Sequence, residues 1–174
     1  RVEEDQRVQV AVAGVEHVAV LEAVFRHDGR NSRQGLGQQG ARHRAVVDQA
    51  AAGLIADMRD AGIPAVVLST ETNPVVGARC KKIGVPVIQG VAAKAEALAE
   101  YLEANSIAGS KVVYLGNDSN DLPCFPLVGW SVVVSDAQPQ TLRAADWVLN
   151  QRGGHGAVRE LCELILQRLE QSDR

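Results

Sequence analysis

Aromatic residues, paired cysteines and long apolar runs are all scarce in this sequence. Aromatic side chains make up 3% of it, so a hydrophobic core has to be built from Val, Leu, Ile and Ala. Cys80, Cys124 and Cys162 are too few and too scattered for a disulfide framework, and no CxxC pair indicates a zinc site. We therefore expect three reduced thiols in the core.

Membrane-spanning runs and an excess of one charge are also missing. No uninterrupted apolar stretch is long enough to cross a bilayer, and the first residues show no signal-peptide pattern. The net charge of -3 combines both signs, which gives no electrostatic reason to expect nucleic acid or an anionic membrane as partner. The composition predicts a soluble cytoplasmic protein, and 174 residues suffice for one packed domain but are short for two.

Short apolar runs alternate with segments of helical periodicity along most of the chain. Strands are expected at 18–25, 65–68, 85–88, 112–115, 130–134 and 147–149. Helices are expected at 53–61, 74–83, 92–104, near 122, after 139 and at 157–169. Because the strand runs are continuously apolar, this order predicts an α/β fold with a parallel sheet and helices on both faces.

The stretch KVVYLGNDSND, residues 111–121, places a polar cluster at the end of one such strand. Asn117, Asp118, Asn120 and Asp121 follow the apolar run within five positions. Open α/β sheets bind ligands outside the carboxyl ends of their strands, and oxygen-rich side chains there suit Mg²⁺. Helix capping selects the same residue types, so a polar turn that only caps the next helix is the alternative.

Two further strand ends carry groups that could bind a phosphoryl oxygen. Ser69 and Thr70 follow one strand, and Lys94 follows the next in the turn QGVAAK. The alternatives are a helix cap for the two hydroxyls and a solvated surface charge for the lysine. Hydroxyl, ammonium and carboxylates on successive strand ends suit a phosphoryl group and its metal ion.

Four segments in sequence order carry a resemblance to a known family. They are LSTETNPVVGARCKKIGVPVIQGVAAKAEAL, VVYLGNDSNDLPCFPLVG, VVVSDAQPQTLRAADWVL and GGHGAVRELCELIL. The chain from Gly53 to Leu166 resembles the haloacid dehalogenase-like superfamily. Within it, the chain is similar to the capless 3-deoxy-D-manno-octulosonate 8-phosphate phosphatases and to the C-terminal domain of some bacterial N-acylneuraminate cytidylyltransferases. The resemblance implies a three-layer Rossmann-like fold without a large cap domain, a phosphatase of phosphorylated sugar acids that uses Mg²⁺, and a homotetramer.

The resemblance also assigns roles to residues, and one of them does not match. Ser69, with Thr70 beside it, matches the hydroxyl that binds a phosphoryl oxygen, and Lys94 matches the lysine that neutralises it. Phosphatases of the superfamily carry Asp-x-Asp-Gly after the first strand, where this sequence has VFRHDGRNS. Asp28 thus matches the acid/base. Arg26 stands at the nucleophile position and cannot attack phosphorus, because its guanidinium stays protonated.

The metal motif matches with a second departure. Asn117, Asp118 and Asp121 correspond to the acidic metal residues, and in phosphatases of the family this run usually begins Gly-Asp-Asp. Here it begins Gly116, Asn117, Asp118. An amide at the metal position is expected to weaken Mg²⁺ binding, and this form looks more like the cytidylyltransferase-associated relatives.

One hypothesis explains Arg26 by an out-of-frame segment within residues 1–50 of an otherwise single domain. Residues 26–44 are rich in Arg, Gln and Gly, as shifted translation of a GC-rich gene tends to be. Arg-His-Asp can be encoded CGA CAT GAC, and translation one base later gives GAC ATG, which places an aspartate at the nucleophile position. Resequencing the gene tests this hypothesis, and peptides from an unbroken frame in this region would contradict it.

These residues are compatible with two classes of function. One is a Mg²⁺-dependent sugar-acid phosphatase impaired by Arg26, and the other is a noncatalytic domain that serves oligomerisation or regulation beside an N-acylneuraminate cytidylyltransferase. A response-regulator receiver also combines Asp, Thr and Lys on a parallel sheet, but its acidic pair comes early in the chain. Asp136 is expected to start a turn, and His155 either begins the last helix or lines a site in an oligomer. His17, His27 and His43 are expected on the surface or in loops.

Overall fold

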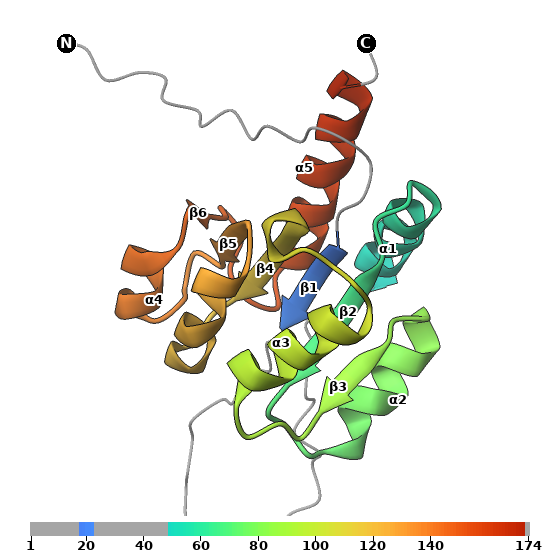
Figure 1. Cartoon of the computed structure of the whole chain (residues 1–174). Helices are drawn as coiled ribbons and strands as arrows, with labels where there is room; N and C mark the ends of the chain where they lie inside the picture. Colours follow the sequence, from blue (N-terminus) through green and yellow to red (C-terminus); the bar gives the residue numbers. More distant parts are fainter. Residues whose placement is uncertain (1–17, 23–48, 173–174) are drawn as a thin grey trace, which may run out of the picture.

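The computed structural model describes residues 18–22 and 49–172, and these residues form a three-layer α/β arrangement. All six predicted strands are present and pair in parallel in the order β3-β2-β1-β4-β5-β6. Figure 1 shows β1 between β2 and β4. The strands are β1 (Val18–Glu22), β2 (Ala65–Ser69), β3 (Val87–Gln89), β4 (Val112–Gly116), β5 (Trp130–Val133) and β6 (Trp147–Val148). The predicted parallel sheet is therefore confirmed, and within the described residues the strand boundaries agree to within two residues.

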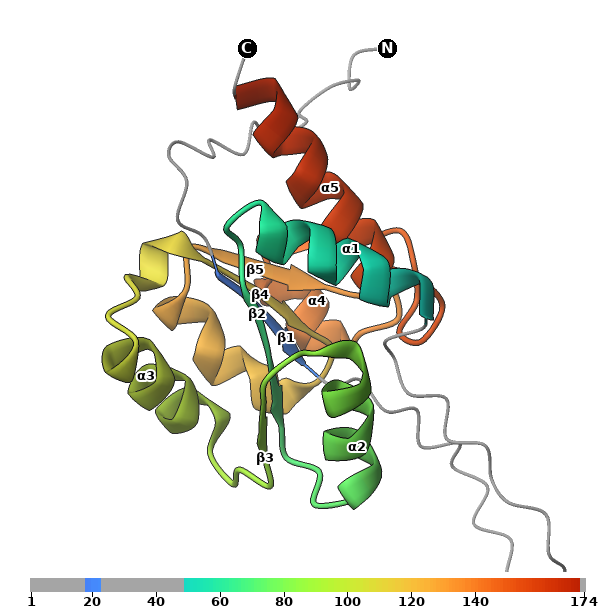
Figure 2. The ribbon, with the colours of Figure 1, turned by 90° about the vertical axis from the view of Figure 1, so that its right-hand side faces the viewer.

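The helices cover both faces of the sheet. They are α1 (Gln49–Asp60), α2 (Pro74–Ile83), α3 (Lys94–Ala104), α4 (Pro139–Ala144) and α5 (Ala157–Ser172), with 3₁₀ helices η1 (Gly109–Lys111) and η2 (Ser119–Leu127). Side chains of α1, α2 and α5 pack together on one face, and those of α3 and η2 on the other (Figure 2). The predicted helix near residue 122 is the 3₁₀ helix η2. It contains Pro123 and Pro126, which lack the N–H that an α-helix needs.

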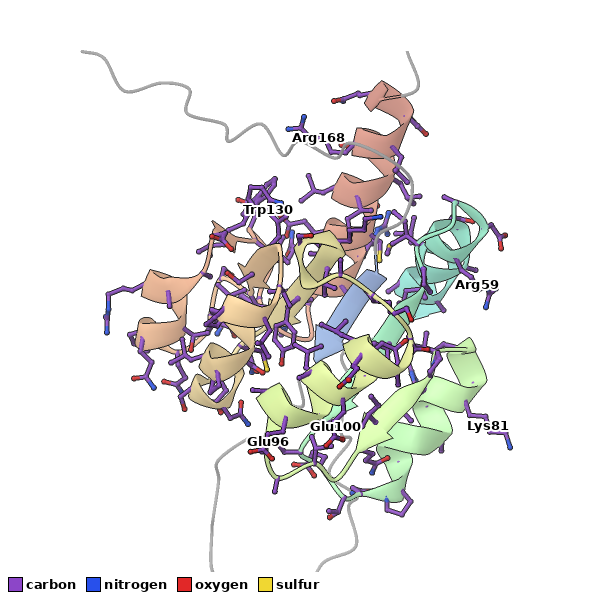
Figure 3. All side chains as sticks on the ribbon, viewed as in Figure 1. Arg59, Lys81, Glu96, Glu100, Trp130 and Arg168 are labelled. Carbon is purple, nitrogen blue, oxygen red and sulfur yellow. The ribbon has the colours of Figure 1, made fainter. Side chains whose placement is uncertain are left out.

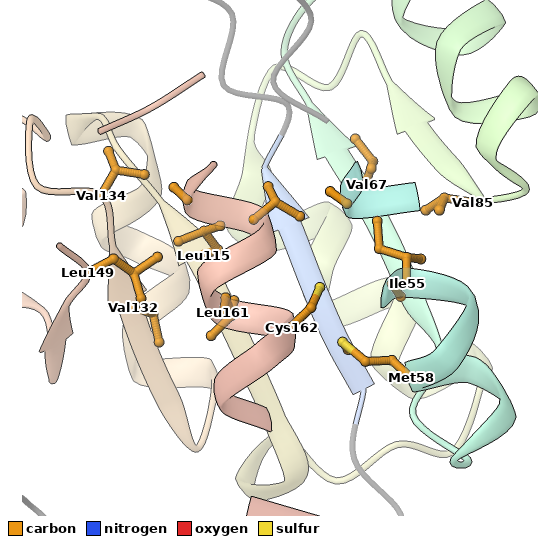
Figure 4. Close-up of a cluster of buried hydrophobic side chains, with 14 of the residues drawn as sticks. Ile55, Met58, Val67, Val85, Leu115, Val132, Val134, Leu149, Leu161 and Cys162 are labelled. Carbon is orange, nitrogen blue, oxygen red and sulfur yellow. The ribbon is translucent and has the colours of Figure 1, made fainter. Parts of the chain in front are cut away.

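The larger core is aliphatic, as the low aromatic content predicts. It lies between the sheet and the helices α1 and α5, and Figure 4 shows Ile55, Met58, Leu115, Val132 and Leu161 among its side chains. None of the three cysteines forms a disulfide and all three are buried, which confirms that they are core thiols. Burial raises the pKa of the Cys162 thiol to about 12, so this thiol stays protonated at neutral pH.

The start of α2 shows whether Ser69 and Thr70 cap this helix, which was one of the alternatives for their hydroxyls. Asn73 caps this helix by accepting a hydrogen bond from the Val75 N–H at 3.0 Å, and Pro74 occupies the first turn. Gly84 ends the helix in the left-handed conformation, with φ of 70°. Ser69 and Thr70 lie upstream of this cap, so the interpretation of their hydroxyls as caps of the next helix is wrong.

The outer faces of the helices carry charges of both signs. Lys81 on α2 and Glu96 and Glu100 on α3 lie on the outer sides of their helices and point away from the sheet (Figure 3). This mixture agrees with the small net charge of the sequence. In the described part of the chain, no helix is long and apolar enough to cross a membrane.

Candidate functional site

The strand order reverses direction beside β1, which marks the position where α/β sheets of this order bind ligands. Strands β2 and β3 follow on one side of β1, and β4, β5 and β6 on the other. The register pairs Glu22 with Leu68 and Leu21 with Leu115, so the carboxyl ends of β1, β2 and β4 lie at one level. Ser69 and residues 116–121 therefore flank the end of β1, and we call these residues together with Lys94 the strand-end site.

Lys94 is bound inside this site by a buried ion pair. Its ammonium nitrogen Nζ lies 2.7 Å from Asp121 Oδ1 and donates to Asn120 Oδ1 at 3.2 Å. Both side chains of the Lys94–Asp121 pair have an exposed fraction of 0%. The interpretation of Lys94 as a solvated surface charge is therefore wrong. The first residue of α3 places a positive charge in the interior at the ligand-binding edge of the sheet.

Asp121 holds the loop that follows β4. Its Oδ2 accepts hydrogen bonds from the backbone N–H groups of Asn117 at 2.8 Å and Asp118 at 3.0 Å, while Tyr114 OH donates to its Oδ1 at 2.7 Å. A Cβ atom on Gly116 would lie 2.8 Å from Asp121 Oδ2, so only glycine fits there without a shift. With the lysine, four donors occupy the two carboxylate oxygens, which favours an anchoring role for Asp121 over the predicted metal-ligand role.

Asp118 caps the start of η2, as the polar-turn alternative expected. Its Oδ1 accepts from the Ser119 N–H at 2.6 Å and from the Ser119 hydroxyl at 3.1 Å, and Asp118 and Asp121 form a capping box. The cluster thus does cap a helix. It also binds the lysine, which a plain capping turn would not do.

The described residues do not provide the ligand set that Mg²⁺ prefers. No group of three His, Cys, Asp or Glu side chains is placed to hold a metal ion in the part of the chain that the structure describes. Asp121 is committed to four donors, and Asn117 contributes a neutral amide. Asp118 is left as the single carboxylate of this loop that could offer an oxygen to a hard cation.

The two predicted hydroxyl ligands differ in their surroundings. Ser69 has an exposed fraction of 2%, and its Oγ accepts a hydrogen bond from the Glu71 N–H at 3.1 Å. Thr70 is exposed. Because β2 and β4 lie on either side of β1, and neighbouring strands are about 4.8 Å apart, the backbones at Ser69 and Asn117 are about 10 Å apart, on opposite sides of the end of β1.

Arg26 and Asp28 lie outside the described residues, as do His17, His27 and His43. Their predicted roles at the nucleophile and acid/base positions therefore stay predictions. They follow Glu22, the last residue of β1, along the chain.

The structure adds Tyr114 and Asn120 to the residues that bind the Lys94–Asp121 pair. Tyr114 was expected only as a buried strand residue, and its exposed fraction is 0%. A buried tyrosine hydroxyl needs a hydrogen-bond partner, and this requirement was the available signal for its contact with Asp121. Asn120 already belonged to the predicted polar cluster, but the sequence did not indicate its contact with Lys94, because Lys94 begins a helix elsewhere in the chain.

Asp136 and His155 lie in two different turns that both contact Gly153. Asp136 lies after β5, and its carboxylate accepts from the Gly153 N–H at 2.7 Å and pairs with Arg152 Nε at 3.3 Å. His155 is exposed in the turn before α5, with its Nδ1 3.0 Å from the Gly153 carbonyl oxygen. Asp136 therefore starts a turn between β5 and α4, as predicted, and its side chain bonds that turn to the segment before α5.

Comparisons with known proteins agree with this architecture. A family model described as haloacid dehalogenase-like hydrolase matches residues 77–161. A structure from Streptomyces avermitilis, assigned to the HAD family of hydrolases, is 38% identical, with a TM-score of 0.74 over 87% of this chain and 86% of that chain. The cobalt-bound deoxy-D-mannose-octulosonate 8-phosphate phosphatase from Haemophilus influenzae is 27% identical, with a TM-score of 0.75 over 91% of each chain.

A curated relative points in the same direction over a shorter alignment. The 3-deoxy-D-manno-octulosonate 8-phosphate phosphatase of Salmonella typhi is 39% identical over 105 residues, or 60% of this chain. The chain spans 56% of the length of that relative.

Proposed function

Because this chain belongs to the haloacid dehalogenase-like hydrolase family, we propose that its strand-end site binds the phosphoryl group of a phosphorylated sugar acid. The substrate would be of the 3-deoxy-D-manno-octulosonate 8-phosphate or the N-acylneuraminate 9-phosphate type. The curated relatives support the first type, and the Gly116-Asn117-Asp118 form supports the second.

The observation that carries this proposal is the buried Lys94–Asp121 pair at the switch point of the sheet. Burying an ammonium group is costly unless a partner and hydrogen bonds compensate it. Asp121, Asn120 and the loop bonds provide that compensation, and they hold the ammonium beside the end of β1. Lys94 and Ser69 would then bind the phosphoryl oxygens, with Thr70 at the exposed rim.

Hydrolysis by the route of this family needs an aspartate where Arg26 stands. In an Arg26→Asp protein, the new carboxylate would attack phosphorus while Asp28 protonates the leaving alkoxide, which forms an aspartyl-phosphate and releases the sugar acid. Asp28 would then take a proton from water as the water oxygen attacks the phosphorus of the aspartyl-phosphate, releasing phosphate and restoring the aspartate. The chain with Arg26 would bind the phosphate ester without cleaving it in this way.

Mg²⁺ is the cofactor that phosphatases of this family use, where it offsets negative charge on the phosphoryl group. Asp118 and Asn117 are the loop residues that could reach it, together with Asp28. Since one carboxylate of the described loop is available, we assign none of the steps above to the metal.

Phosphate release tests this proposal. The chain with Arg26 and its Arg26→Asp variant are incubated with each of the two sugar-acid phosphates and Mg²⁺, and Arg26→Asn serves as a control that removes the charge without adding a nucleophile. We expect Arg26→Asp to exceed both others by at least about a hundredfold in turnover. If a folded Arg26→Asp protein hydrolyses neither substrate, the catalytic assignment fails.

Two departures favour a second candidate, a noncatalytic domain associated with an N-acylneuraminate cytidylyltransferase. They are Arg26 at the nucleophile position and Asn117 at the metal position. A domain of this kind would serve oligomerisation or regulation, and a homotetramer is the assembly that the family suggests. Equilibrium sedimentation of the purified chain tests the tetramer, which a monomeric mass at micromolar concentration would contradict.

A further inference from the structure

The second half of α5 extends beyond the amino ends of the strands. The helix has 16 residues and is about 24 Å long, whereas β1 has five residues and is about 17 Å long. Its first half packs against the larger core through the buried residues Val158, Leu161 and Cys162. Figures 1 and 2 show the rest of α5 projecting past the sheet, and we call residues 164–172 the projecting half.

The projecting half carries apolar side chains in more than one direction. Ile165 continues the buried stripe, because it follows Leu161 by four positions, and Leu169 follows it by four more. Leu164 and Leu166 lie on either side of this stripe, since consecutive helical residues point about 100° apart. All four side chains of the projecting half are only half-buried. A helix that is apolar in several directions needs more cover than one sheet face provides.

One segment outside the described residues leads into the sheet at this end of α5. Residues 23–48 join the carboxyl end of β1 to the start of α1, and α1 itself returns to the amino end of β2, so they belong to the opposite edge. Residues 173–174 are too few to cover a helix face. Residues 1–17 lead directly into Val18, the amino end of β1, and Figure 4 shows α5 passing in front of that strand.

Residues 8–15, VQVAVAGV, have the composition of a core segment. They carry no charge, and Val8, Val10 and Val12 alternate with smaller or polar residues, so an extended chain would place these valines on one side. A segment that stays in solvent is typically rich in charge and poor in apolar residues, which is the opposite composition. Residues 16–17 alone separate this segment from β1, so the projecting half of α5 lies within its reach.

We propose that residues 8–15 dock on the projecting half of α5 and cover its leucine and isoleucine side chains. Two apolar surfaces of one chain then leave water together. The chain's own segment is favoured over a second copy, because the short connection through residues 16–17 keeps it at a high local concentration. Docking would also fix the entry of β1, the strand whose carboxyl end the strand-end site surrounds. The proposal does not depend on phosphate binding, so either one can fail without the other.

Photo-cross-linking of the complete chain identifies what covers the projecting half. Gln167→Cys is labelled with a benzophenone maleimide at an exposed position between Leu166 and Arg168, which leaves the apolar side chains in place. The native cysteines are buried, so the label reacts with the new thiol. Glu100→Cys is the matched control, because it is exposed on α3, which packs on the opposite face of the sheet. Isotope-labelled and unlabelled chains are mixed before irradiation, and mass spectrometry then locates the cross-links. We expect the Gln167→Cys label to react with residues 8–15 of its own chain at least about fivefold more than the Glu100→Cys label does.

Two results of this experiment would overturn the proposal. Cross-links that mainly join chains of different isotope content would show that a second copy covers the projecting half. A label that does not react with residues 8–15 above the control would show that this segment docks elsewhere or not at all.

A pair of double variants tests whether the valines make the contact. Val10→Asp with Val12→Asp adds two charges at apolar positions, and we expect it to lower the cross-linking of the Gln167→Cys label to residues 8–15 at least about fivefold, because a docked segment would bury these charges. Gln6→Asp with Gln9→Asp adds the same two charges at polar positions and should stay within about twofold of the unaltered segment. Equal cross-linking in the two double variants would contradict docking through the valines.

Discussion

Among single residues, Lys94 and Asp121 form the contact on which the strand-end site depends. Both side chains are fully buried, and Asp121 also receives Tyr114 and two backbone N–H groups. Removing one partner of a buried ion pair leaves an uncompensated charge, which typically costs about 3–5 kcal/mol. The stability of the fold and the position of the ammonium are therefore determined by the same bonds.

The first stability prediction concerns this pair. We expect Asp121→Ala and Lys94→Met each to lower the free energy of unfolding by about 3 kcal/mol or more. The double variant should lose less than the sum of the two, by about 1–3 kcal/mol, because it leaves neither charge unpaired. Urea unfolding followed by circular dichroism measures all three differences.

An exposed residue provides the control for the two single variants and the double variant. Asn105→Ala changes an exposed residue at the end of α3, and we expect it to stay within about 1 kcal/mol of the unaltered chain. If the two single changes at Lys94 and Asp121 are strictly additive, the two side chains do not stabilise each other.

Between elements, a close backbone contact joins η1 to the end of η2, at the amino ends of β4 and β5. A Cβ on Gly109 would collide with the Leu127 carbonyl oxygen, and a Cβ on Gly129 with the Ser110 carbonyl oxygen. Gly129 N–H also donates to the Gly109 oxygen at 2.7 Å. The two glycines allow the backbones to cross closely, just before β4 and β5 begin.

Substituting alanine at two glycines tests the crossing. Gly129→Ala should lower the free energy of unfolding by about 1–3 kcal/mol, because the rigid backbone has to move away from the methyl group. Gly53→Ala is the matched control. It lies in α1, where an added methyl group would meet no atom within 4 Å, so it should raise stability by up to about 1 kcal/mol. Thermal unfolding of both variants gives the comparison, and equal stabilities would contradict a close crossing.

At the scale of the whole molecule, the buried core thiols make the free energy of unfolding decrease at alkaline pH. Burial raises the pKa of Cys162 to about 12 and also raises the pKa of Cys80, so folding favours the protonated thiols. The unfolded chain releases these protons near the ordinary thiol pKa of 9.0. The stabilisation from Cys162 is therefore complete below pH 9 and is lost as the pH rises from 9 toward 12.

Unfolding at several pH values checks this dependence. Between pH 9 and 11, we expect the unaltered chain to lose about 1 kcal/mol more per pH unit than Cys162→Val, which has no titrating group at this position. Measurements near pH 7 are the control. The thiol is protonated there in both the folded and the unfolded state, so the difference in unfolding free energy between the two proteins should not change with pH. Parallel curves above pH 9 would show that Cys162 does not titrate differently in the folded and unfolded states.

The assembly and the cytoplasmic location stay predictions at this level. The charges of both signs on the outer faces of the helices agree with the expectation that no nucleic acid or anionic membrane is a partner, but they do not test it.

Local patterns in the sequence are sufficient for the α/β order of this protein. Continuous apolar runs predict buried strands, and Pro74 and Gly84 mark the ends of α2 because their backbone preferences act within a few residues. The same local patterns locate the strand ends, and so they also indicate the candidate residues there. The parallel sheet brings those ends to one edge whatever the details of packing.

The roles of those residues depend on contacts between distant parts of the chain. Lys94, Tyr114 and Asp121 come from three different elements, and the sequence does not show that the carboxylate of Asp121 is shared between the lysine, the tyrosine hydroxyl and two N–H groups. A residue type limits what a side chain can bind, whereas the tertiary fold selects the partner, because a partner must be brought within hydrogen-bond distance.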